Sequence, residues 1–168
     1  RLKKASEIEE WLKRGKIFVS NSYKSSNYGH QGAKIDSPQK RYEFFELTRL
    51  MEFSKFGFNI PQPDLNILLD VHPKISLQNA SARNADKGTE NDGHEKSDSY
   101  AAKVIQAFRE IASYDPTWRV INCVDGDKMI PPTEIAEKIW ETVRPYLPPR
   151  FENGSNSPQT IIFPQQNS

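Results

Sequence analysis

The sequence predicts an α/β fold built on a parallel sheet, and three observations support this. Three β-rich apolar runs, "KIFVS", "DLNILLDV" and "WRVINCV", occupy residues 16–20, 64–71 and 118–124. Segments with apolar residues at helical spacing alternate with these runs, as in parallel sheets joined by right-handed crossovers. The second run is almost continuously apolar, which is typical of a strand covered on both faces. A chain of 168 residues is long enough for one domain with a full core.

Composition argues against several classes of protein. The formal net charge is +1 and the mean hydropathy is −0.75, so broad electrostatic binding of nucleic acid or membrane is not expected. No apolar run approaches the roughly 20 residues of a membrane helix, and residues 1–16 lack the apolar core of a signal peptide. Cys123 is the single cysteine and lies in an apolar run. We therefore expect a buried reduced thiol and a cytoplasmic protein.

Two helices are predicted in the first third of the chain. The first has apolar residues at helical spacing, followed by a glycine stop: Leu2, Ala5, Ile8, Leu12 and Gly15. A strand at 16–20 and a polar loop to residue 34 follow. The second helix begins with Asp36 or Ser37 as N-cap and Pro38 in its first turn, and ends at Gly57. Its predicted apolar positions are Phe44, Leu47, Leu50, Met51 and Phe53.

The rest of the chain alternates strands and helices. After the strand at 64–71, a short helix is expected from Pro73 to about Arg83, and then an exposed charged loop at 84–96. A long helix is predicted from about Ser97 to Ser113, with Ala101, Val104, Ile105, Phe108 and Ala112 on one face. The strand at 118–124 and a loop precede a last helix capped by Thr133, with apolar positions Ile135, Ala136, Ile139, Trp140 and Val143. The tail, 148–168, is expected to be disordered or loosely docked.

The stretch "YKSSNYGHQGAK", residues 23–34, is dense in small hydrogen-bond donors and acceptors. In parallel sheets ligands bind beyond the carboxyl ends of the strands, and this stretch follows the first predicted strand. The segments after residue 72 and at 124–131 reach the same edge. A polar ligand is therefore expected there.

Several motifs occur in an order that resembles the thymidylate kinase family. They are "RGKIFV", "SNYGHQGAK", "PQPDLNILLDVHP", "DGHEK", "WRVINC" and "EIAEKIWETV", and they span about residues 1–147. The family consists of P-loop kinases that pass the γ-phosphoryl group of ATP to dTMP with Mg²⁺. The resemblance implies a three-layer αβα parallel sheet of the P-loop kinase type, with a lid at about 84–96. The family commonly forms homodimers, and the resemblance extends that option to this chain.

The glycine-rich phosphate loop of the family, of the kind GxxGxGK(S/T), does not occur in the 168 residues. In the family the strand before this loop lies between the strands that match 16–20 and 64–71. We therefore expect an incomplete sheet with unpaired backbone groups on a buried edge. We also expect the chain to be the carboxyl-terminal part of a longer kinase and inactive by itself.

The resemblance implies a set of residues that bind dTMP: Arg1, Tyr23, Asn27, His30, Gln31 and Glu95. The Asn27 amide can both donate and accept, which suits the N3–H and O4 of thymine, although a turn residue that caps its own backbone is the alternative. His30 stands near the sugar and base, where most relatives have tyrosine. Glu95 matches a lid residue that approaches the sugar.

Two lid cations, Arg83 and Lys87, are implied to screen the charge on the transferring phosphoryl group, with Arg83 also touching ATP. A solvated charged loop is the alternative for both. Val124, Asp125 and Gly126 match the segment that flanks adenine, where backbone groups make the contacts. No set of side chains has metal-ligand spacing, so no protein metal site is expected. The resemblance implies Mg²⁺ as cofactor and ATP as co-substrate.

Two positions depart from the family. Asn21 and Ser22 replace an aspartate that helps hold Mg²⁺ and an arginine that clamps the monophosphate, and neither can supply the missing charge. A non-catalytic nucleotide-binding homologue is therefore an alternative function. A structural or protein-binding α/β domain is another. Asp70 suits either a second shell around Mg²⁺ or a cap of the helix at Pro73, and we favour the cap. His72 is expected to be exposed, without a chemical role.

Overall fold

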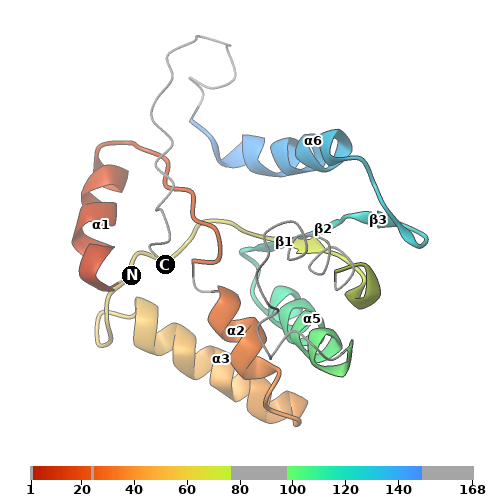
Figure 1. Cartoon of the computed structure of the whole chain (residues 1–168). Coiled ribbons are helices and arrows are strands. Elements are labelled where there is room, and N and C mark those ends of the chain that lie inside the picture. Colours follow the sequence, from red (N-terminus) through yellow and green to blue (C-terminus); the bar gives the residue numbers. More distant parts are fainter. Residues whose placement is uncertain (1, 24, 77–97, 149–168) are drawn as a thin grey trace, which may run out of the picture.

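The computed structural model describes residues 2–23, 25–76 and 98–148 of the chain (Figure 1). Its elements are η1 (Leu2–Lys4), α1 (Ala5–Lys13), α2 (Ser25–Gly32), α3 (Pro38–Phe53), β1 (Asn66–Asp70), α5 (Asp98–Tyr114), β2 (Trp118–Asn122), β3 (Val124–Asp125), β4 (Lys128–Met129), α6 (Pro132–Val143) and η2 (Arg144–Tyr146). Residues 73–76 are also helical. The predicted lid and nearly all of the predicted tail lie outside the described residues.

β1 and β2 form a parallel pair, in register from Asn66 opposite Trp118 to Asp70 opposite Asn122. Helix α5 lies between the two strands in sequence and packs against both. Figure 1 shows α5 and α6 on opposite sides of this pair. The α/β class predicted from the sequence is therefore confirmed, as are the strands predicted at 64–71 and 118–124. The larger three-layer sheet of a P-loop kinase remains a prediction.

The prediction of a strand at 16–20 is wrong. Residues 16–20 have no assigned strand, and no segment of the described ranges forms a ladder with them. Ile17 and Val19 are 38% and 45% exposed. A strand needs hydrogen-bonding partners as well as an apolar pattern, and the pattern alone does not supply them.

The polar loop predicted before residue 34 is also wrong, because residues 25–32 form helix α2. Glycine and serine disfavour helix interiors, so the local sequence argues for a loop. Tertiary packing overrides this preference: Tyr28, Gly29 and Gly32 are buried on one side of α2. The helix is therefore held by the core of the molecule more than by its own sequence.

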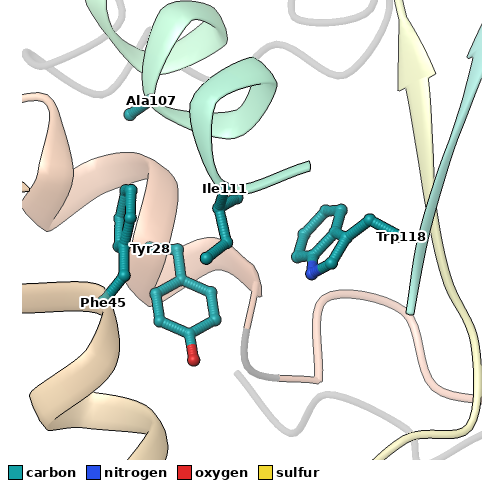
Figure 2. Close-up of a cluster of buried hydrophobic side chains, with 5 residues drawn as sticks. All are labelled: Tyr28, Phe45, Ala107, Ile111 and Trp118. Carbon is teal, nitrogen blue, oxygen red and sulfur yellow. The ribbon is translucent and has the colours of Figure 1, made fainter. Parts of the chain in front are cut away.

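The core lies where α2, α3 and α5 meet β2. Figure 2 shows its buried side chains, which are Tyr28, Phe45, Ala107, Ile111 and Trp118. The rings of Tyr28 and Phe45 meet edge to face, with centroids 5.3 Å apart and an interplanar angle of 88°. Aromatic pairs prefer this geometry. On α5 the most buried positions are Ala107 and Ile111, whereas the predicted face of that helix is only half-buried.

Helix α3 begins as predicted but turns a different face inward. Ser37 is the N-cap, and its hydroxyl accepts from the Lys40 backbone N–H at 3.4 Å. Phe45 is 1% exposed, whereas Leu47 and Leu50 of the predicted apolar face are 58% and 52% exposed. The buried Arg41, one turn before Phe45, pairs with Glu110 of α5 and so directs this side of α3 toward α5. The helix ends at Phe53, four residues before Gly57.

The two terminal helices follow the prediction only in part. In α1 Ile8 is buried, and Gly15 follows the helix with φ +68°. α6 begins at Pro132 with Pro131 as N-cap, so the cap predicted at Thr133 is wrong. Proline at the first position of a helix supplies the fixed φ that a helix start needs. No residue of α6 is fully buried, and this helix contacts β2 and η2.

Candidate functional site

Helix α2 carries three of the residues expected to bind the nucleoside. Asn27, His30 and Gln31 stand at i, i+3 and i+4, so they share one side of the helix. His30 and Gln31 are exposed and Asn27 is half-buried. The structure therefore brings these three predicted residues together, opposite the side that anchors α2.

Two glycines set the position of this polar side. A Cβ on Gly29 would lie 2.3 Å from the Phe108 ring, and one on Gly32 would lie 3.1 Å from the Phe45 ring. Phe108 thus approaches the backbone at Gly29 more closely than a side chain there would allow, and Phe45 approaches the backbone at Gly32 more closely than most side chains would allow. The close approach at both glycines is made by aromatic side chains of the core.

His30 lies beside Tyr100, a residue near the start of α5. The His30 Nδ1 and the Tyr100 hydroxyl are 3.2 Å apart, and the two rings are stacked with centroids 6.2 Å apart. The contact joins positions that are 70 residues apart in the chain. Sequence reasoning did not select Tyr100, since no local pattern distinguishes it from an ordinary helix residue.

Tyr23 faces a different part of the molecule. Its hydroxyl donates to the Pro61 carbonyl oxygen at 3.3 Å, and its ring meets Phe18 edge on. Tyr23 lines a cavity of about 510 Å³ that lies between residues 15–23 and 61–67 and is bordered by Trp118. Asn27, His30 and Gln31 are not among the residues that line this cavity. The structure therefore separates Tyr23 from the polar side of α2.

Asn21 and Ser22 form an exposed turn at the edge of the same cavity. Ser22 has φ +56°, a left-handed conformation that is uncommon outside glycine. Its hydroxyl donates to Asn21 Oδ1 at 3.3 Å. The two residues therefore satisfy each other as neutral polar groups, and neither offers the charge that the family places at these positions.

Asp70, at the carboxyl end of β1, is an ion-pair partner and not the predicted helix cap. Arg109 Nε donates to its two carboxylate oxygens at 3.1 and 3.0 Å, and Arg109 Nη2 lies 2.9 Å from Oδ2. The Lys74 backbone N–H donates instead to His72 Nδ1 at 3.3 Å. His72 is exposed, as predicted, but it caps the helix. Arg109 is a cation at the carboxyl end of β1 that sequence reasoning missed.

The segment expected to flank adenine forms part of a hairpin. β3 and β4 pair antiparallel across a turn in which Gly126 has φ +57°. The Val124 N–H donates to Asn122 Oδ1 at 3.1 Å, and Asn122 Nδ2 donates to the Val124 carbonyl at 3.0 Å. Both backbone groups of Val124 are thus engaged. Asp125 and Gly126 are exposed.

Four predicted site residues, Arg1, Arg83, Lys87 and Glu95, lie outside the described residues. Within residues 2–23, 25–76 and 98–148, no three His, Cys, Asp or Glu side chains gather as a metal site would require. Over the same ranges no helix combines the length and apolar character needed to span a bilayer.

Two buried groups have shifted pKa values. Burial raises the pKa of the Cys123 thiol, and nearby Asp70 acts in the same direction. The thiol is free and buried, as predicted. Burial also raises the pKa of the Tyr28 hydroxyl, with Glu52 and Asp115 as further causes. Both shifts favour the neutral form, which suits groups that pack the interior.

Comparison with known proteins finds relatives in the same family that the sequence motifs resemble. No family model and no solved structure matches the chain. A thymidylate kinase of Rhodopseudomonas palustris is 27% identical over 144 residues, covering 82% of this chain and 54% of the relative. A thymidylate kinase of Solidesulfovibrio magneticus is 27% identical over 143 residues, covering 83% of this chain and 62% of the relative. One from Bradyrhizobium diazoefficiens is 33% identical over 88 residues, which are 52% of this chain and 36% of the relative.

The chain thus spans 54% and 62% of the length of the first two of these relatives. The matches to them extend over four-fifths of the chain and agree in the name of the relative. They show that the chain is similar to thymidylate kinases over most of its length.

Proposed function

We propose that this chain supplies the nucleoside-recognising part of an ATP-dependent thymidylate kinase that converts dTMP to dTDP. The observation that supports this most is the polar side of α2. Asn27, His30 and Gln31 lie there together, inside the motif that most specifically resembles the family. Recognition of a base and sugar needs such neutral donors and acceptors, and these three side chains supply them on one side of one helix.

The anchoring of α2 supports recognition in a second way. Gly29 and Gly32 bring the helix backbone against Phe108 and Phe45, so the polar side is held by a packed core. A binding surface that is ordered before the ligand arrives loses less conformational entropy on binding. In this proposal Asn27 pairs with the thymine edge, while His30 and Gln31 contact the base or sugar.

Phosphoryl transfer enters the proposal through residues outside the described ranges. Arg83 and Lys87 would screen the transferring phosphoryl group, and Glu95 would approach the sugar. The described residues do not fit a magnesium site, since no three His, Cys, Asp or Glu side chains gather among them and Asn21 offers only a neutral oxygen. No step is therefore assigned to a metal held by these side chains.

A non-catalytic nucleotide-binding homologue is the second candidate, and the turn at Asn21 and Ser22 favours it. A dTMP kinase has to compensate the negative charge of the monophosphate. These two residues are neutral and hydrogen-bonded to each other. A cation from elsewhere would have to replace them, and Lys24 and Lys34 follow them in the same segment of the sequence.

The deciding experiment measures binding and turnover separately. Calorimetry would titrate dTMP into the chain, and a coupled assay would follow ATP consumption by the longest natural form of the protein. Consumption of ATP that depends on dTMP supports the kinase. Binding without consumption supports the second candidate. The absence of binding at millimolar dTMP would contradict both.

Asn27→Ala tests the recognition surface directly. We expect a roughly tenfold weaker dTMP affinity, since one well-placed hydrogen bond is lost. The fold should be unaffected, because Asn27 is not in the core. Gln39→Ala, which removes an exposed amide from α3, is the matched control and should leave affinity unchanged. Equal affinities of Asn27→Ala and the unmodified chain would show that Asn27 does not contact the base.

A further inference from the structure

The pair formed by His30 and Tyr100 joins the proposed recognition surface to the start of α5. Its atoms are close, with 3.2 Å between Nδ1 and the phenol oxygen, and its rings stack at an interplanar angle of 24°. The packing of Gly29 against Phe108 holds α2 on α5. The geometry of the pair therefore depends on two helices whose backbones are fixed against each other.

The hydrogen bond has two possible directions with opposite consequences. A neutral imidazole has one N–H donor and one acceptor nitrogen, and the bond made by one nitrogen sets the state of the other. If the Tyr100 hydroxyl donates to Nδ1, then Nε2 carries the proton and is a donor. If Nδ1 donates to the hydroxyl, then Nε2 is an acceptor. The direction decides what His30 can offer a ligand.

Chemistry favours the first direction. An imidazole nitrogen is a stronger base than a phenol oxygen, and a phenol O–H is the more acidic donor, so O–H···N is the better bond. A donor at Nε2 would also find partners in the ligand, because thymine and deoxyribose present several oxygen acceptors.

We propose that Tyr100 is a positioning residue that holds His30 as an Nε2–H donor toward an oxygen of the bound nucleoside. This inference rests on the proposed function. The stacked ring restricts rotation of the imidazole, and the hydroxyl selects its tautomer. Tyr100 thereby adds to the recognition of dTMP without touching it.

The tautomer can be measured without any nucleotide. Long-range ¹H–¹⁵N correlation spectra of the chain, at a pH where histidine is neutral, distinguish a protonated from an unprotonated Nδ1. The sequence has three histidines, and His30→Gln assigns the signal of His30. We expect an unprotonated Nδ1 in the unmodified chain and a mixture of tautomers in Tyr100→Phe, which keeps the ring and removes the hydroxyl. A protonated Nδ1 in the unmodified chain would overturn the proposal.

Affinity for dTMP is the second readout. Tyr100→Phe should weaken binding about threefold to tenfold, and should have no further effect when combined with His30→Gln. Tyr114→Phe removes a phenol hydroxyl at the other end of α5 and is the control, with no effect expected on either readout.

The outcomes separate the two proposals. If the unmodified chain binds dTMP and Tyr100→Phe changes neither tautomer nor affinity, the role of Tyr100 is wrong and the proposed function stands. If the unmodified chain binds no dTMP, the proposed function fails and the role in recognition fails with it. The spectra then still show whether Tyr100 sets the tautomer of His30.

Discussion

Tyr28 places a hydroxyl inside an otherwise apolar cluster. Its side chain is 4% exposed, and its ring packs between α2 and α3 (Figure 2). Burial is the largest cause of its raised pKa, followed by the charges of Glu52 and Asp115. All three causes disfavour the phenolate. The folded chain thus holds the proton of Tyr28 more tightly than the unfolded chain does.

Alkaline pH should therefore destabilise the fold through Tyr28. Below pH about 10 the hydroxyl is protonated in both states, so its contribution to stability is fully present. Above that pH the unfolded state loses the proton first, and the free energy of unfolding falls by up to about 1.4 kcal/mol per pH unit. Urea unfolding at pH 9 to 11 measures this free energy. We expect it to fall less steeply with pH in Tyr28→Phe than in the unmodified chain. Tyr42→Phe, at an exposed tyrosine of α3, is the control; the same decline in all three chains would contradict this prediction.

Single residues were predictable where their role is local. Ser37 caps α3 because a hydroxyl just before Pro38 suits a helix start. Cys123 is buried because it stands within an apolar strand segment. Arg109 and Tyr100 were not predictable, since their partners lie 39 and 70 residues away. A pair of this kind depends on how elements pack, which one sequence does not specify locally.

At the scale of elements, α2 illustrates how packing overrides composition. Its sequence, "SSNYGHQG", consists of poor helix formers except for Gln31. The same glycines that weaken it as an isolated helix allow α5 and α3 to approach its backbone. The buried positions Tyr28 and Gly32 have helical spacing. This pattern predicts a helix only when glycine is counted as a residue that packs in the core.

Gly29→Ala tests this account of α2. Alanine normally favours a helix interior by about 1 kcal/mol over glycine. Here its methyl group would lie 2.3 Å from the Phe108 ring, so either α2 or Phe108 has to move. We expect a net loss of about 1–3 kcal/mol of unfolding free energy, typical of overpacking. Denaturant unfolding measures it.

The double variant Gly29→Ala with Phe108→Leu is the control for the steric cause. Leucine lacks the ring atoms that the methyl group would meet. The double variant should therefore lose less unfolding free energy than the two single variants lose in sum. If Gly29→Ala is at least as stable as the unmodified chain, α2 does not lie this close to α5.

The ion pair between Arg41 and Glu110 joins α3 to α5. Arg41 is buried; its Nε and Nη2 donate to the two carboxylate oxygens at 2.6 and 3.0 Å, and its guanidinium also donates to the Ile35 carbonyl. Glu110→Gln would leave the buried guanidinium without its counter-charge. We expect a loss of roughly 3 kcal/mol in thermal or urea unfolding.

An exposed ion pair provides the comparison. Glu134 and Lys138 pair at i, i+4 on α6 with their nitrogen and oxygen 3.0 Å apart, and both are exposed to solvent. Glu134→Gln should change stability by no more than about 0.5 kcal/mol. Equal losses for the two variants would show that Arg41 is not buried as described.

For the whole molecule, the sequence predicted the class and most helices but not the extent of the sheet. β1 and β2 are paired, whereas residues 16–20 run unpaired beside the cavity of about 510 Å³ that separates them from residues 61–67. The expectation that another strand belongs between these two segments remains a prediction. The apolar patterns of 16–20 and 64–71 look alike in sequence, and only pairing distinguishes them in the structure.

Helix α3 has a row of exposed apolar side chains. Leu47, Leu50 and Met51 stand at i, i+3 and i+4 and are 58%, 52% and 49% exposed. Contiguous exposed apolar patches can mark interaction surfaces, and these three side chains are neighbours on the helix. We propose that a second copy of the chain covers them, since a helix can pair with its own image around a two-fold axis.

Light scattering coupled to size exclusion tests this homodimer. We expect a mass of twice the 19.3 kDa of one chain, decreasing to the monomer when Leu47→Glu is combined with Leu50→Glu. Both leucines are exposed in one chain, so the charges cost little unless a partner covers them. Lys128→Glu changes the net charge by the same two units at an exposed site in the β3–β4 hairpin and should leave the mass at the dimer value. A monomeric mass for the unmodified chain at tens of micromolar would exclude the dimer; a dimeric mass for the double variant would place the interface elsewhere than on α3.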